Sequence, residues 1–184
     1  MSVSQQSYSA WMLRLHWLTV LLIIAIYASI EFRVIFVKGS LERDLIKEVH
    51  FVLGLSLWCI TWLRLLVRRF SLIPLIEPAP KAAVLKIAAL MHAALYVFLL
   101  LMPVLGYLLL SAADSIIPFW GVQLPALIKP DPDVAAFIKE VHELVGKTGY
   151  VFIALHVLGA LAHHYIAKDN TLKRMLPALF STKS

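Results

Sequence analysis

The stretch FIKEVHELVGKTGYVFIALHVLGALAHHYIA, residues 137–167, decides the fold of this chain. It is apolar over most of its length and carries histidines at positions 142 and 156. On one α-helix these two rings lie within roughly 40° of the same face and about 21 Å apart along the axis. A bilayer core is about 30 Å thick, so a single membrane helix would carry one imidazole near each side. Two metal centres stacked across a membrane need this arrangement.

The composition is that of a membrane protein. Of the 184 residues, 61% are hydrophobic and only 15% are charged, which is less charge than soluble domains carry. The single cysteine, Cys59, allows no intramolecular disulfide, and no CxxC or CxxCH motif occurs. Zinc fingers and covalently attached c-type haem are therefore excluded. The length fits one domain over residues 1–184, and the N-terminus does not read as a cleavable signal peptide.

Four apolar segments are long enough to cross a bilayer. They are residues 11–36, 45–66, 84–110 and 137–167. Histidines and small residues within them favour the interior of a bundle over isolated anchors. We therefore predict an all-α, four-helix transmembrane bundle. The longest connection, residues 111–136, is rich in proline and is expected at the outer membrane interface.

The distribution of charge predicts the orientation of the bundle. The side that holds both termini carries ten Lys and Arg residues and two acidic residues, and the other side carries seven and nine. Positively charged residues concentrate on the cytoplasmic side of membrane proteins. Both termini are therefore expected in the cytoplasm. The basic face suits anionic membrane lipid, and we expect no nucleic-acid partner.

The histidines are the candidate functional residues, because an ionisable side chain inside a membrane span is functional by default. The alternative for any one of them is a hydrogen bond to a neighbouring helix. Depth along the spans selects two pairs. His50 and His142 each lie five residues into spans that start on the outer side, and His16 and His156 both lie toward the cytoplasm.

Two imidazoles per site favour haem over a bare metal ion. Bis-histidine ligation fills both axial positions of a haem iron and suits electron transfer, whereas zinc prefers more ligands of mixed type. Gly54, Gly146 and Gly159 each follow a paired histidine by three or four residues, where a missing side chain leaves room for a flat macrocycle. The alternative is that these glycines serve helix packing. His92 could replace a member of the inner pair, but a hydrogen-bonding role is favoured.

Several stretches resemble a known family over essentially the whole chain. They are RLHWL at 14–18, IYASIEFR at 26–33, VHFVLG at 49–54 and ALHVLGALAHHYIAKDNTLKRMLP at 154–177. Together they resemble the small four-helix bacterial cytochrome b561 family, in particular its members with superoxide oxidase activity. The resemblance implies two haem b groups, ligated by His16 with His156 and by His50 with His142. It also implies a multi-pass protein of the bacterial inner membrane.

The activity implied by this resemblance is superoxide:ubiquinone oxidoreductase. Superoxide would give up an electron at the outer face, and the two haems would pass it to ubiquinone. Arg33 and Lys47 are candidates for steering the anion, with a solvated charged face as the alternative. A cytoplasmic quinone site is expected at His163, His164, Lys168 and Asp169. The alternative function is an electron-relay subunit that links a dehydrogenase or hydrogenase partner to the quinone pool, because fold alone does not separate the two.

Overall fold

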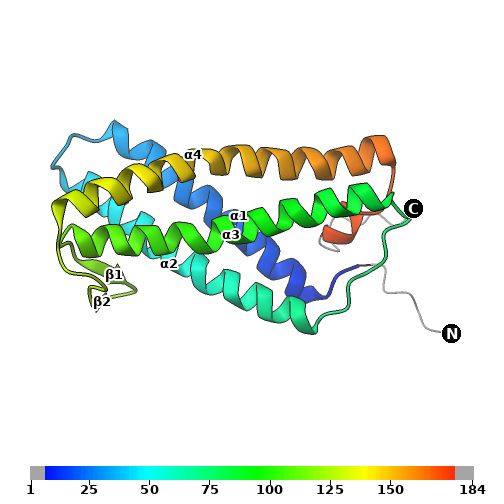
Figure 1. Cartoon of the computed structure of the whole chain (residues 1–184), viewed down its shortest axis with the longest axis horizontal. Coiled ribbons are helices and arrows are strands. Elements are labelled where there is room, and N and C mark those ends of the chain that lie inside the picture. Colours follow the sequence, from blue (N-terminus) through cyan, green and yellow to red (C-terminus); the bar gives the residue numbers. More distant parts are fainter. Residues whose placement is uncertain (1–6, 177–184) are drawn as a thin grey trace.

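The computed structural model describes residues 7–176 and contains four long helices arranged side by side (Figure 1). They are α1 (Ala10–Phe32), α2 (Leu41–Phe70), α3 (Ala82–Ala112) and α4 (Pro132–Ala162). Counting the short helical turns that continue α1 and α4, all four are long and apolar enough to cross a membrane. The predicted helical bundle is confirmed, and the chain is a multi-pass membrane protein.

The helices begin at positions that suit their unpaired backbone N–H groups. Ser9 precedes α1 and accepts from the backbone of Met12, and Ser40 precedes α2 and accepts from Arg43. Asp131 precedes α4 and accepts from two backbone N–H groups. Such caps satisfy donors that have no partner within the helix. With these caps, α2 and α4 begin several residues before the apolar spans that the sequence predicts.

The chain runs up and down, so the two ends of the bundle differ (Figure 1). At the terminal end, α1 begins, α4 ends, and a connection links α2 to α3. At the hairpin end lie the connection from α1 to α2 and a small β-hairpin between α3 and α4. Helix α1 continues there as a 3₁₀ turn, Arg33–Ile35 (η1), while α4 continues at the terminal end as a π-helical turn, His163–Ala167 (η2).

A small apolar core lies at the middle of the bundle. Its buried members are Leu57 of α2 and Phe98 and Leu99 of α3. Side chains from α1 and α4 pack against them, namely Leu22, Ile23, Ile26, Val145 and Phe152, with Met102 of α3. Most other large apolar side chains are exposed. Lipid is as apolar as they are, so a membrane bundle gains little by burying them.

A β-hairpin occupies part of the long proline-rich connection between α3 and α4. β1 (Ile117–Phe119) pairs antiparallel with β2 (Val122–Leu124). The two residues between them, Trp120 and Gly121, both have positive φ, as two-residue hairpin turns require. The Trp120 indole donates to the Ser56 hydroxyl of α2 at 3.0 Å. The strands are too short for an alternating pattern to reveal them in the sequence.

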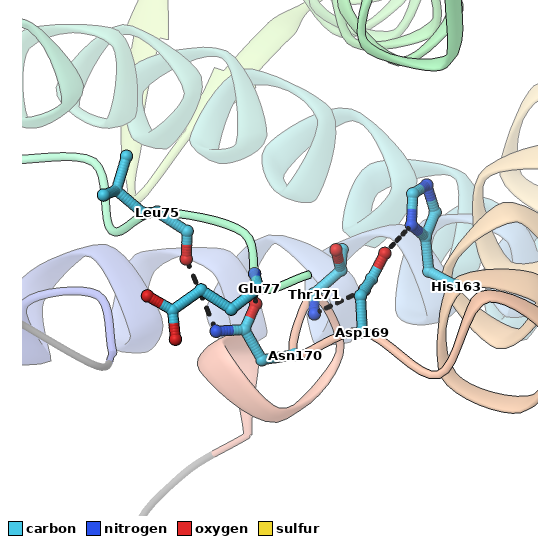
Figure 2. A network of polar contacts seen from close by, with 6 residues as sticks. All are labelled: Leu75, Glu77, His163, Asp169, Asn170 and Thr171. Atoms are coloured by element: carbon cyan, nitrogen blue, oxygen red, sulfur yellow. Dashed lines mark hydrogen bonds and ion pairs between the residues drawn. The ribbon is translucent and has the colours of Figure 1, made fainter. Parts of the chain in front are cut away.

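The segment after α4 folds back across the terminal end (Figure 2). Asn170 exchanges hydrogen bonds with the backbone of Glu77 and donates to the Leu75 carbonyl. Arg174 lies within a 3₁₀ turn, Lys173–Met175 (η3), and donates to the Pro74 carbonyl. The last described residues are thereby tied to the connection between α2 and α3.

Gly149 allows close packing of three helices. A Cβ atom at this position would overlap the Tyr27 hydroxyl of α1 and the Phe98 ring of α3. We expect Gly149→Ala to lower the free energy of unfolding by about 1–3 kcal/mol, because overpacking forces neighbours out of position. Denaturation of the purified protein in detergent measures this. Thr148→Leu is the control, because Thr148 is exposed; equal midpoints for both variants would contradict the prediction.

Candidate functional site

The first candidate site lies toward the hairpin end, where His50 of α2 faces His142 of α4. The centroids of the two rings are 6.5 Å apart and the ring planes are inclined by 72°. Both histidines line a cavity of about 440 Å³. Its walls come from all four helices and from Ile117 of β1. The cavity therefore joins the two imidazoles inside the bundle.

Backbone and side-chain groups of α1 hold the His50 ring in place. Its Nδ1 lies 3.2 Å from the Ile26 carbonyl oxygen and 3.1 Å from the Ser29 hydroxyl. A carbonyl can only accept, so this contact places a proton on Nδ1 and leaves Nε2 of the neutral ring free to bind a metal. Metal-binding histidines are commonly oriented in this way. No motif in the sequence points directly to these partners.

The His142 ring is positioned by close packing. Its Nδ1 is buried and has no hydrogen-bond partner among the described residues. Gly106 of α3 lies against the ring, and a Cβ there would be 3.5 Å from His142 Cε1. A larger residue at position 106 would press on the imidazole. Gly106 was missed at the sequence level, because nothing in the sequence shows that it faces α4.

The second candidate site lies toward the terminal end. His16 of α1 and His156 of α4 have ring centroids 6.4 Å apart and ring planes inclined by 64°. The Arg64 guanidinium of α2 lies 3.2 Å from His16 Nδ1. His92 of α3 is also near, at 5.5 Å from His156 between centroids, but it is exposed. Three histidines therefore gather at this level, and two of them repeat the geometry of the first site.

The distance between the ring centroids indicates whether each histidine pair can bind one metal ion between its two rings. A metal ion about 2 Å from the nitrogen of each of two opposed imidazoles holds the centroids roughly 6–6.5 Å apart. The His50–His142 and His16–His156 pairs both match this spacing, and the His92–His156 pair is closer. No group of three or more His, Cys, Asp or Glu within residues 7–176 is placed to hold a metal ion. Two axial imidazoles with the remaining positions left to a macrocycle fit haem.

The glycines singled out in the sequence take different positions. Gly54 and Gly146 line the cavity beside His50 and His142. Gly159 does not line it, although a Cβ at this position would meet no described atom within 4 Å. The structure therefore brings two of the three glycines to a histidine pair. That Gly159 leaves room for a haem beside His156, or instead serves helix packing, stays a prediction.

Basic side chains line the same cavity near the hairpin end. Arg33 and Lys47, predicted to steer an anion, both contribute to its wall. Lys47 Nζ lies 2.7 Å from Asp44 Oδ1, so much of its charge is paired. Arg33 Nε is buried without a hydrogen-bond partner among the described residues. Four more charged residues line the cavity: Glu31, Lys139, Glu143 and Lys147.

The residues predicted to form a quinone site lie at the terminal end. His163 Nδ1 is 2.5 Å from Asp169 Oδ2, and Thr171 donates its backbone N–H to Asp169 Oδ1 (Figure 2). Burial raises the pKa of the Asp169 carboxyl, but the hydrogen bonds from His163 and Thr171 outweigh this and lower the pKa. His164 packs against Tyr165, and Lys168 is exposed. The structure therefore brings His163 and Asp169 into contact, whereas His164 and Lys168 take no part in that contact.

Comparison with known proteins agrees with this geometry. Residues 7–178 match the family described as prokaryotic cytochrome b561. Cytochrome b561 homolog 1 of Escherichia coli (strain K12) is 38% identical over 92% of this chain and 97% of its own length. The probable superoxide oxidase CybB of Yersinia pestis is 33% identical over 94% and 97%, and cytochrome b561 homolog 2 of E. coli is 29% identical over 88% and 86%. The chain belongs to the prokaryotic cytochrome b561 family, whose members bind b-type haem and transfer electrons in membranes.

Proposed function

We propose that this protein is a superoxide:ubiquinone oxidoreductase with two b-type haems. Superoxide is oxidised at the hairpin end and ubiquinone is reduced at the terminal end. Two superoxide anions each lose one electron and become dioxygen. One ubiquinone takes up those two electrons and two protons and becomes ubiquinol.

The observation that carries this proposal is the presence of two histidine pairs with matching ring spacing on either side of the mid-bundle core. His142 and His156 both belong to α4, and their spacing separates the two sites by about 21 Å along the helix. His50 and His16 face them at the same ring spacing. When bound, haem supplies the one-electron chemistry. The chain's own part is to fix two such groups at different depths in the membrane.

Several observations support the choice of substrates and orientation. A relative with high coverage is named as a probable superoxide oxidase. Arg33 and Lys47 place positive charge at the cavity that holds the hairpin-end pair, and positive charge raises the rate of capture of an anion. The excess of Lys and Arg at the terminal end favours a bacterial inner membrane protein with cytoplasmic termini. The quinone is then assigned to the terminal end, near His163, His164, Lys168 and Asp169.

Haem content tests the ligand assignment. We expect two non-covalent b-type haems per chain in the purified protein and one in His50→Ala or His16→Ala, because each change leaves an iron without one axial ligand. His92→Ala is the matched control on α3 and should keep both. The pyridine haemochrome assay with protein quantification measures the ratio. Loss of haem in the His92 variant but not in the His16 variant would show that the pair at the terminal end is wrong.

The rate of reduction by superoxide tests the entry site. Arg33→Gln should slow the second-order reduction of the haem several-fold at low salt and weaken its dependence on ionic strength, because electrostatic steering is screened by salt. Lys47→Gln should have a smaller effect, because Asp44 already pairs with Lys47. Stopped-flow mixing of the protein with superoxide at several salt concentrations measures both.

Lys38→Gln is the control for this experiment. Like Arg33, Lys38 lies between α1 and α2 and carries one positive charge, but it does not line the cavity. Equal rates and salt slopes for all three variants would remove the steering role of Arg33. A wild-type haem that superoxide fails to reduce would overturn the proposed donor and favour a relay subunit that receives electrons from a protein partner.

A further inference from the structure

Two arginines of α2 gather over one tyrosine of α3 near the terminal-end histidine pair. The Cζ atoms of Arg64 and Arg68 each lie 5.7 Å from the centroid of the Tyr96 ring. The two arginines are four residues apart, so they lie on one face of α2, one turn from each other. Like charges at this spacing repel each other. The aromatic ring attracts each guanidinium, but it neutralises neither charge.

The arginine cluster, Arg64 with Arg68, has no acidic partner. The ion pairs found within residues 7–176 involve neither arginine. Arg64 lies about 9 Å before the end of α2 at Phe70 and is only partly exposed. A charged side chain at such a depth in a membrane is costly unless an opposite charge meets it. The arginine cluster therefore has the charge of a site for a doubly negative group.

This cluster borders both histidines of the terminal-end pair. Arg64 contacts His16 directly. Tyr96 follows His92 by one turn of α3, and the His92 ring centroid lies 5.5 Å from that of His156. A group bound between His16 and His156 would thus have the arginine cluster at its edge.

The contact between Arg64 and His16 indicates which nitrogen is left for a metal. Arg64 Nη2 lies 3.2 Å from His16 Nδ1. A guanidinium only donates, so Nδ1 is the acceptor in this contact, and the proton of the neutral ring is on Nε2. A ring that binds a metal through Nε2 carries its proton on Nδ1 instead, and Nδ1 then no longer accepts from Arg64. Metal binding at His16 therefore releases the Arg64 N–H groups for another acceptor nearby.

We propose that Arg64 and Arg68 hold the propionate groups of the haem at the His16–His156 pair. This inference rests on the proposed function, which places a b-type haem at that pair. Haem b carries two propionate carboxylates on one edge, so its negative charges equal the positive charges of the arginine cluster. A guanidinium binds a carboxylate through two parallel hydrogen bonds. The two arginines are positioning residues, because they fix the rotation of the macrocycle about the axis between its two axial imidazoles.

The test observes the propionates themselves in the purified holoprotein. Cells fed with 5-aminolevulinate that is isotopically labelled at its carboxyl carbon make haem that is labelled only at the propionate carboxylates. Reduced-minus-oxidised infrared spectra of labelled and unlabelled protein then identify the carboxylate bands of these groups. Arg64→Gln and Arg68→Gln should each shift the label-sensitive bands, because a carboxylate loses its guanidinium partner. Arg69→Gln is the matched control: Arg69 is an exposed neighbour with the same charge, and its loss should leave the bands in place.

Redox titration separates contact from a distant effect of charge. Arg64→Gln should shift the reduction equilibrium of the terminal-end haem about tenfold toward the oxidised form, or about 59 mV for one electron, because the propionate charge is no longer compensated. Arg64→Lys keeps the charge without the planar fork, so it should retain most of the potential and still shift the bands. In His16→Ala, which is expected to lack this haem, adding Arg64→Gln should change neither the bands nor the potential of the remaining haem.

Each other outcome has a distinct meaning. Unshifted label-sensitive bands in Arg64→Gln and Arg68→Gln would overturn the propionate contact, even if the potential fell. Loss of a bound anionic phospholipid from these variants, detected by native mass spectrometry with the bands unshifted, would show that the arginine cluster binds a lipid headgroup instead. An equal shift in Arg69→Gln would also overturn the contact, because surface charge in general would explain it.

Two results separate this inference from the proposed function. If Arg64→Gln fails to retain the haem, Arg64→Lys and Arg68→Gln decide the outcome by the same bands. A wild-type protein that holds one haem per chain would overturn the proposed function itself. Two haems in the wild type with unshifted bands in every arginine variant would overturn only the role of the arginine cluster.

Discussion

Close contact of α4 with its neighbours at Gly149 is the constraint on which the two sites depend. Gly149 lies midway between His142 and His156 on the same face, and the Tyr27 hydroxyl and the Phe98 ring occupy the space of its missing side chain. Tyr27 also donates to the Gly146 carbonyl at 2.7 Å. With α1 and α3 held this close, histidines above and below the contact can meet their partners at equal distances. A wider separation at this point would part both pairs.

The two pairs differ in what surrounds their rings. At the hairpin end, the Ile26 carbonyl accepts from His50, which makes the imidazole a stronger electron donor to a metal. At the terminal end, the Arg64 guanidinium lies beside His16, and a nearby positive charge favours the reduced metal. Arg33 and Lys47 also place positive charge at the cavity of the hairpin-end pair, so the hydrogen bond from His50 to the Ile26 carbonyl is the clearer difference between the two sites.

Much of the fold and part of the site could be predicted from the sequence. Hydropathy and length fix four spans, because lipid requires every backbone group to bond within its own helix. Depth along the spans then matches His50 with His142 and His16 with His156. Rotation of one helix against another is not encoded in such local patterns. The sequence therefore did not reveal Gly106 against the His142 ring or Ser29 beside His50.

Other features were missed because they depend on the path of short segments. The hairpin at Trp120 is too brief to show periodicity, and its contact with Ser56 joins residues 64 positions apart. The bond between His163 and Asp169 depends on a π-helical turn and a left-handed residue at Lys168. By contrast, the pairing of Lys47 with Asp44 spans only three residues of α2 and is of a kind that a sequence can suggest.

The apolar core at Leu57, Phe98 and Leu99 has an electrical consequence. Its aliphatic and phenyl side chains offer no chain of groups along which a proton could hop, whereas an electron can tunnel between the two sites. Under the proposed function, in which protons are taken up at the terminal end and superoxide is oxidised at the hairpin end, each turnover would carry negative charge toward the cytoplasm. A membrane potential that is negative inside opposes this movement by about 2.3 kcal/mol per charge per 100 mV if the charge crosses the whole membrane. The energised state of the membrane would then act as a brake on turnover.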